Sequence, residues 1–224
     1  MNKVIAGVVA VLALGTFSTV SAVVMKWGGD VFFTNTFGGG LRGNTAEIMG
    51  YETSFKTPSS GFGINWFYDA TYAEIDIGLI SGTLTQKGSA GDGSSINQSD
   101  AYASFNLGAL GKYPIALSGY DNISLWPALG IDYSFVGLRW REDGDCNALW
   151  IKFGAGGDYA WKDNMFLRAK LLYGIRMANE AENYFKDQTG GKTVLGQGLD
   201  IGVGVGWFLR GRESSKSRSG NDFD

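Results

Sequence analysis

Apolar and polar residues alternate along most of the chain beyond about residue 29. The last such segment, residues 199–208, is the most regular, with Leu199, Ile201 and Val203 on one face and Asp200 and Gly202 on the other. Side chains of a β-strand point to opposite faces in turn, so this period of two predicts strands rather than helices. Seven further segments are predicted to be strands: residues 29–39, 61–69, 73–79, 103–109, 129–135, 149–156 and 167–174.

The connections between these eight segments alternate in length. Short ones are predicted near residues 70–71, 119–121 and 161–164, and long polar ones at about 40–60, 86–99, 137–147 and 178–196. An even number of strands joined by alternating short and long connections is typical of bacterial transmembrane β-barrels, which have brief periplasmic turns and longer external loops. The pattern therefore predicts an all-β fold, a single eight-stranded antiparallel up-and-down transmembrane β-barrel.

Two prolines interrupt the predicted strands around the middle short turn. Pro114 and Pro127 lie at nearly mirrored positions about residues 119–121. Proline has no N–H to donate to a strand ladder. We therefore expect the hairpin between them to be bulged or to project below the barrel, with regular pairing beyond each proline.

The first 22 residues have the layout of a cleaved signal peptide. Lys3 precedes an apolar run from Val4 to Leu14, and the segment ends in small residues up to Ala22. The hydroxyl residues after the apolar run favour a cleavage region over a membrane-anchoring helix. This organisation predicts export, and outside the signal peptide no apolar run approaches the length of about 20 residues that a membrane helix needs.

The rest of the chain divides into a barrel and a tail. Residues 23–210 carry the strand pattern, and residues 211–224 are rich in serine and charge with no apolar periodicity. Such a composition predicts a disordered polar tail. The formal net charge of −3 provides no basic face, which argues against nucleic acid as a partner.

Residue content also limits the chemistry that we expect. The chain has no histidine, so nucleophilic sites of the Ser-His or Cys-His kind and histidine metal sites are excluded. Cys146 is the single cysteine and cannot form an internal disulfide. We therefore expect no enzyme activity, no metal and no cofactor.

Alternation alone does not decide which face meets lipid. The polar face is dominated by glycine with isolated charges, whereas a solvated exterior would carry many lysine, glutamate and threonine residues. Small residues suit the crowded interior of a narrow barrel, so we expect the apolar face to point outward into lipid. Aromatic residues near strand ends fit interface girdles: Trp66, Tyr68, Tyr159, Trp161, Trp207 and Phe208.

Charged residues on the other face form a candidate lumen network. Charges in a narrow barrel are costly unless they are paired, and the interior of eight strands is only wide enough to be filled by side chains. We expect a buried ionic plug, with a gate whose ion pairs exchange as the alternative. The residues are Glu74, Asp76, Asp132, Asp158, Asp200, Lys152, Arg168, Lys170 and Arg176.

The pattern over residues 23–210 resembles small eight-stranded outer-membrane barrels of the outer membrane protein X, protein W and protein A types. The segment from Leu125 to Tyr133 is similar to strand-entry sequences of such barrels. The resemblance implies an outer-membrane location and insertion by the barrel assembly machinery, which reads a last strand ending in an aromatic residue. Here Trp207-Phe208 is followed by further residues to Asp224, so that signal is internal.

Three functions are consistent with the sequence. The first is a non-enzymatic surface protein embedded in outer-membrane lipid, whose external loops meet a host or envelope protein. The second is a narrow porin-like channel for ions or small hydrophobic solutes. The third is a soluble periplasmic lipocalin-like binder, in which the apolar face would point inward.

Overall fold

The protein forms a single sheet that closes on itself. The computed structural model describes residues 24–44, 52–89, 95–138, 147–177 and 192–209. Their strands are β1 (Met25–Asn44), β2 (Glu52–Lys56), β3 (Ser59–Ala70), β4 (Ala73–Ser89), β5 (Ser95–Lys112), β6 (Ile115–Leu117), β7 (Tyr120–Leu138), β8 (Ala148–Lys162), β9 (Met165–Arg176) and β10 (Lys192–Phe208).

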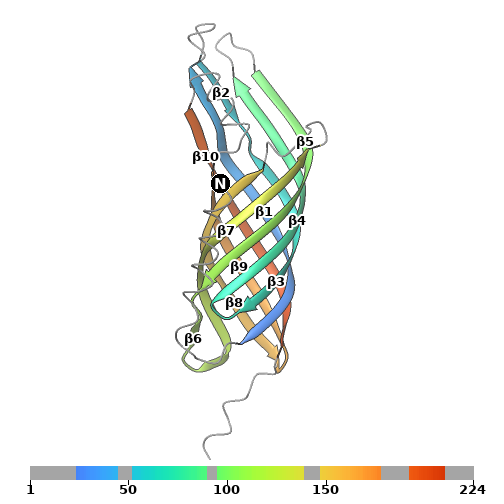
Figure 1. The fold of residues 1–224 in the computed structure, drawn as a ribbon, viewed down its shortest axis with the longest axis vertical. Helices are drawn as coiled ribbons and strands as arrows, with labels where there is room; N and C mark the ends of the chain where they lie inside the picture. The colour runs from blue at the N-terminus through green and yellow to red at the C-terminus, as the bar shows by residue number, and fades with distance from the viewer. Residues whose placement is uncertain (1–23, 45–51, 90–94, 139–146, 178–191, 210–224) are drawn as a thin grey trace, which may run out of the picture.

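Eight of these strands build the barrel wall (Figure 1). Each pairs antiparallel with the next in the order β1-β3-β4-β5-β7-β8-β9-β10, and β10 pairs back onto β1. The short strands are local additions, because β2 pairs with β1 and β4 above the start of β3, and β6 pairs with β7. The predicted eight-stranded up-and-down barrel is thereby confirmed.

The strands are longer than the alternation predicts. β1 continues to Asn44, and β4 and β5 form a hairpin that runs to Ser89 and from Ser95, so most of the loops expected at 40–60 and 86–99 are strand. These extensions rise beyond the barrel at the top of Figure 1. Their sequences do not alternate, because consecutive residues such as Asn97, Gln98 and Ser99 are all exposed, which removes the apolar period on which the prediction rested. The three short turns lie where they were predicted.

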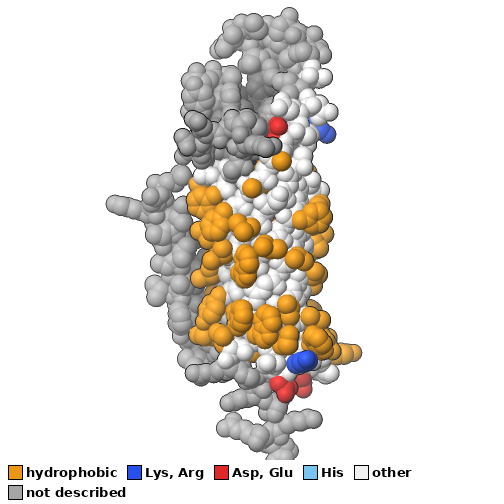
Figure 2. All heavy atoms as spheres, turned by 90° about the vertical axis from the view of Figure 1, so that its right-hand side faces the viewer, with side chains coloured by type: hydrophobic (Ala, Val, Ile, Leu, Met, Phe, Trp, Pro, Cys, Tyr) orange, Lys and Arg blue, Asp and Glu red, His pale blue; other side chains and the backbone are white. Residues whose placement is uncertain are grey.

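The apolar side chains point out of the barrel and the polar ones point in. Phe62 is 72% exposed and Leu129 is 61% exposed, whereas Asp69 and Glu74 are fully buried. Figure 2 shows apolar side chains in a band around this face of the barrel, with the visible charged side chains above and below it. The predicted outward orientation of the apolar face is confirmed, and it is the reverse of a lipocalin-like interior.

Glycines on the inward face give room to large inward side chains. An added Cβ at Gly156 would overlap the ring of Trp126, and one at Gly206 would overlap the ring of Phe166. Bare backbone beneath each ring is therefore needed for these aromatics to fit inside so narrow a barrel. This packing explains why the polar face of the predicted strands is rich in glycine.

Substitution of Gly156 by valine is expected to destabilise the barrel by about 1–3 kcal/mol, because the new side chain displaces the buried Trp126 ring. The measurement is urea unfolding in detergent micelles followed by tryptophan fluorescence. Gly29→Ala is the matched control, since an added Cβ there meets no atom closer than 3.4 Å. Equal stability of the two variants would show that the ring is not held against the glycine.

The hairpin between the prolines projects at the turn end of the barrel. Regular pairing of β5 with β7 ends at Lys112 and Ala128, and beyond it Tyr113 N donates to Pro127 O at 3.1 Å. β6 then pairs with β7 with a register shift after Ala116, below the barrel in Figure 1. The expected bulged and projecting hairpin is confirmed.

Candidate functional site in the barrel lumen

Arg168 on β9 is the centre of a charged layer at the turn end of the lumen. Its side chain is fully buried and contacts three carboxylates. Nη1 donates to Glu74 Oε2 at 2.5 Å, Nη2 to Asp69 Oδ2 at 2.6 Å, and Nε to Asp158 Oδ1 at 2.7 Å. These carboxylates come from β3, β4 and β8, so one guanidinium joins strands on opposite sides of the barrel.

Two lysines complete this layer. Lys112 Nζ lies 2.5 Å from both Asp69 Oδ2 and Glu74 Oε2, and Lys26 Nζ lies 2.8 Å from Asp158 Oδ2. Three cations therefore face three carboxylates. We call this set the turn-side cluster: Lys26, Asp69, Glu74, Lys112, Asp158 and Arg168.

Aromatic rings surround the guanidinium. Arg168 Cζ lies 4.1 Å from the centre of the Phe67 ring and 5.2 Å from those of Trp126 and Phe166. Lys112 Nζ lies 4.7 Å from the centre of the Trp126 ring. Because cation–π attraction grows when the cation is desolvated, these rings support the charges of the turn-side cluster while filling the space between them.

Asp69 also shapes the neighbouring turn. Its Oδ1 accepts the backbone N–H of Thr71 at 2.9 Å, while Oδ2 takes part in the turn-side cluster. Thr71 has a positive φ of 67°, an uncommon conformation for a residue other than glycine. The same carboxylate thus holds the β3–β4 turn and a lumen cation.

A second set of charges lies further along the lumen. Lys170 Nζ lies 2.9 Å from Asp30 Oδ2 and 3.8 Å from Asp76 Oδ1. Lys152 Nζ lies 3.1 Å from Asp132 Oδ2 and 2.8 Å from Asp200 Oδ2. We call these residues the central cluster: Asp30, Asp76, Asp132, Lys152, Lys170 and Asp200. Four carboxylates face two ammonium groups here.

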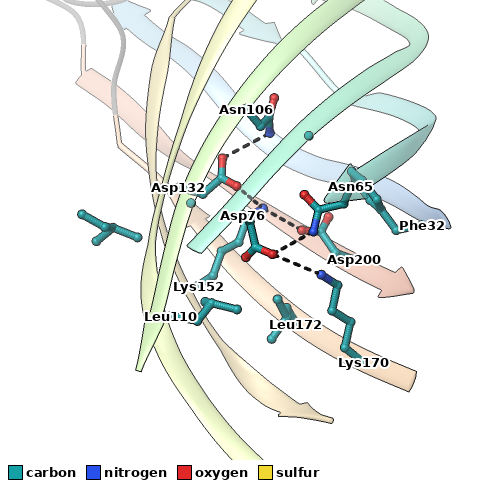
Figure 3. A pocket seen from close by; sticks show the side chains of 13 residues that line it. Phe32, Asn65, Asp76, Asn106, Leu110, Asp132, Lys152, Lys170, Leu172 and Asp200 are labelled. Atoms are coloured by element: carbon teal, nitrogen blue, oxygen red, sulfur yellow. Dashed lines mark hydrogen bonds and ion pairs between the residues drawn. The ribbon is translucent and has the colours of Figure 1, made fainter. Parts of the chain in front are cut away.

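Two amides and a small cavity accompany the central cluster (Figure 3). Asn65 Nδ2 donates to Asp76 Oδ1 at 2.8 Å, and Asn106 Nδ2 donates to Asp132 Oδ1 at 3.1 Å. The cavity, of about 30 Å³, is lined by these amides, by charged residues of the cluster and by apolar groups such as Leu110. That volume is large enough to admit water.

Eight of the nine residues proposed for the lumen network from the sequence take part in these ion pairs. The ninth, Arg176, lies nearer the other end of β9, against Gly39 and Gly196. Four participants were missed: Lys26, Asp30, Asp69 and Lys112. Continuing the predicted alternation of residues 103–109 to the end of the strand would have found Lys112, which falls on the same face as Asn106.

The aromatic residues proposed as girdles divide between two faces. Trp66, Tyr68, Tyr159 and Trp161 are exposed on the outer surface, and Trp207 stacks on Trp27 with ring centres 5.0 Å apart. Phe208 follows the inward face instead, with its ring centre 5.2 Å from that of the buried Phe166. The prediction that Phe208 belongs to the outer girdle was therefore wrong, because it follows Trp207 directly and adjacent residues of a strand point to opposite faces.

Within the described ranges, no group of three or more cysteine, aspartate or glutamate side chains is arranged to hold a metal ion. No helix in that part of the chain is long and apolar enough to cross a membrane.

Comparisons with known proteins give the fold its class. No protein-family model and no curated protein sequence matches the chain. Among solved structures, the chain is similar to the outer membrane protein OprG from Pseudomonas aeruginosa, with a TM-score of 0.51 and 10% identity over 84% of this chain and 97% of that one. Neisserial surface protein A matches with a TM-score of 0.45 and 15% identity, over 81% and 96%.

The fold is that of the small outer-membrane β-barrels. A weaker likeness, with a TM-score of 0.38 and 9% identity over 86% of this chain and 99% of that one, is to the outer membrane protease OmpT from Escherichia coli. The resemblance stated from the strand pattern is confirmed at the level of fold by the OprG match.

Proposed function

We propose that the protein is a non-enzymatic integral protein of the bacterial outer membrane, whose barrel is closed by the turn-side cluster and whose external extensions interact with a partner. The observation that carries this proposal is the burial of three cations and three carboxylates among aromatic rings at one end of the lumen. A barrel filled in this way is an anchor rather than a pore.

The outer surface supports the membrane location. Large apolar side chains are exposed on every strand of the wall, among them Val31, Ile77 and Val203. In water such a surface would lead to aggregation, whereas in a membrane it would contact the hydrocarbon chains of the lipids. Outer-membrane lipid is therefore the proposed surrounding, and the barrel assembly machinery is the proposed route of insertion.

The charge balance supports a closed lumen. Removing any one member of the turn-side cluster leaves the buried charges unequal in number, which costs several kcal/mol. Arg168 is bound from three strands at once, so opening a path past it breaks several charged hydrogen bonds together. This coupling favours a plug over a gate whose pairs exchange one at a time.

Planar bilayer recordings test the closed lumen. The purified barrel is expected to show no stable conductance steps, because the turn-side cluster fills the end of the path. Arg168→Ala, refolded in parallel, is expected to open steps, since it removes the group at the centre of the layer. Stable steps in the unaltered protein would rule out the plug.

A narrow channel is the second candidate, and the central cluster favours it. Its cavity and its excess of carboxylates over ammonium groups would suit the passage of water and small cations. The same recordings separate the candidates, because a channel of this kind would conduct cations in preference to anions without any substitution.

A further inference from the structure

The β6–β7 hairpin continues the outward apolar face of the wall beyond the end of β5. Pairing of β5 with β7 ends at Lys112 opposite Ala128, and β6 resumes it at Ile115 opposite Leu125. Both strands have the same number of residues between these two pairs, so the intervening proline does not shift the register. Residues directly opposite each other share a face, and so do alternate residues of one strand. Tyr113, Ile115 and Leu125 therefore lie on one face, which we call the outer hairpin face.

The outer hairpin face is exposed although its side chains are large and mostly apolar. Tyr113 is 67% exposed and Ile115 is 44% exposed, and Leu125 is exposed beside them. The opposite face turns toward the lumen, because Ser124 lies opposite Asp158 of the turn-side cluster. The two faces of the hairpin therefore differ in the same way as the two faces of the barrel wall.

The register with β8 places this hairpin at the height of the outer aromatic girdle. Leu125 lies opposite Gly157, and Ile123 lies opposite the exposed girdle residue Tyr159. Neighbouring strands lie about 4.8 Å apart and tilt by about 40°, so paired residues differ in height by only about 3 Å. Figure 1 shows β6 beside the lower end of the barrel. The outer hairpin face thus lies at the edge of the apolar band.

The pairing of β6 does not by itself explain why this strand is ordered. β6 has three residues and pairs only with β7 among the described strands, with a register shift after Ala116. An isolated two-stranded hairpin is marginally stable in water. Burial of apolar side chains on the outer hairpin face would supply the missing stabilisation.

We propose that the outer hairpin face binds phospholipid at the interface of the periplasmic leaflet, which makes residues 113–125 a lipid-binding element beyond the barrel wall. The inference goes beyond the proposed function and rests on it only for the membrane location. Tyrosine suits the headgroup level because its ring is apolar and its hydroxyl is polar. Ile115 and Leu125 then contact the first segments of the acyl chains.

A protein partner fits this face less well than lipid does. Apolar patches that bind proteins are typically rimmed by polar residues. The outer hairpin face has no such rim toward the wall, because Pro127 and Leu129 follow Leu125 on the same exposed face of β7. A partner protein would have to displace lipid from the wall to cover the hairpin, whereas the lipid around the wall reaches it directly.

Quenching of a fluorescent label by spin-labelled lipid tests the proposal. Cys146→Ser removes the single cysteine, and Ile115→Cys then carries one nitrobenzoxadiazole label in the full chain, reconstituted into phosphatidylcholine vesicles. Phosphatidylcholine with a nitroxide near the headgroup end of its acyl chain is expected to quench the label about twofold or more, because the label lies at the interface. A nitroxide near the chain end should quench it less.

Two further label sites calibrate the depth. Leu129→Cys lies further into the wall along β7, so the chain-end nitroxide should quench its label more strongly than the headgroup-end one. Ser118→Cys lies in the turn at the tip of the hairpin and should be quenched less than Ile115→Cys by either lipid. Heat-modified migration on a gel confirms that each labelled barrel is folded.

A charged substitution tests whether the apolar side chains hold the hairpin at the interface. With the label at Tyr113→Cys, Ile115→Asp should reduce quenching by the headgroup-end nitroxide about twofold or more, because a carboxylate is costly to bury in acyl chains. Ile115→Val is the matched control and should leave quenching unchanged. Equal quenching of the two variants would show that this face does not hold the hairpin in lipid, which overturns the proposal.

The label at Ile115→Cys can overturn the proposal in two ways. Emission at the wavelength of a water-exposed label, without quenching, would mean that the face lies in water. Blue-shifted emission without quenching would mean that protein covers it. The label at Leu129→Cys separates this failure from failure of the proposed function. Quenching there alone overturns only the inference about the hairpin, whereas no quenching at either site also contradicts a wall embedded in lipid.

Discussion

Replacement of Arg168 by methionine is expected to lower the free energy of unfolding by about 3–5 kcal/mol. The guanidinium donates to Asp69, Glu74 and Asp158, and its removal leaves these three carboxylates with Lys26 and Lys112 alone. Three buried carboxylates then share two lysines, and the uncompensated negative charge costs far more than the lost packing, because methionine keeps much of the side-chain volume. Urea unfolding of the protein in phospholipid vesicles, followed by tryptophan fluorescence, measures the change.

The double variant Arg168→Met with Asp158→Asn is the matched control. It restores the balance of the turn-side cluster, with Lys26 and Lys112 facing Asp69 and Glu74. We expect it to be more stable than Arg168→Met alone, which gives a coupling energy between the two positions. A loss below 1 kcal/mol for the single variant would mean that water enters this end of the lumen and screens the charges.

Replacement of Val203 by arginine is expected to cost about 2–4 kcal/mol, the penalty for a basic residue on the lipid face near the middle of a bilayer. Val203 is 58% exposed, and its cross-strand partners are Val31 on β1 and Ala169 on β9. In a water-soluble barrel, an arginine at so exposed a position would have almost no effect. Unfolding in phospholipid vesicles gives the value.

Thr83→Arg supplies the comparison for this measurement. Thr83 is exposed on β4 toward the extension, opposite Ser60 and Ala101. Its substitution should cost about 0–1 kcal/mol, as expected away from the bilayer centre. Equal losses at the two positions would contradict a membrane-spanning band at the height of Val203.

The direction of the side chains was predictable from the sequence because the pleat fixes it. Leu199, Ile201 and Val203 must share a face wherever the strand lies, and the glycines opposite them identify the crowded side. The extent of β4 and β5 was not predictable in the same way. Upper residues such as Asn97 and Gln98 are exposed although they point to opposite faces, so hydrogen bonding to the neighbouring strand holds them without imposing an apolar period.

The ion-pair partners of the charged residues in the lumen could not be predicted from the sequence. Arg168 contacts Glu74 across the barrel, from a strand that is not its neighbour in the sheet. Such a contact depends on strand tilt and on the register of every intervening pair, none of which alternation specifies. The pattern therefore identified inward charges such as Lys152 and Asp132 without assigning which of them would meet.

The seam between β1 and β10 has a consequence for how the protein reaches this state. Lys26 pairs with Phe208 and Trp27 with Trp207, so the first and last strands of the barrel are paired along their whole length in the wall. Contacts between such distant residues carry a large loop-closure cost and slow the final step. Before β10 pairs with β1, every intermediate sheet has two unpaired strand edges. A chain held at that stage would be exposed to proteases and to pairing with another chain.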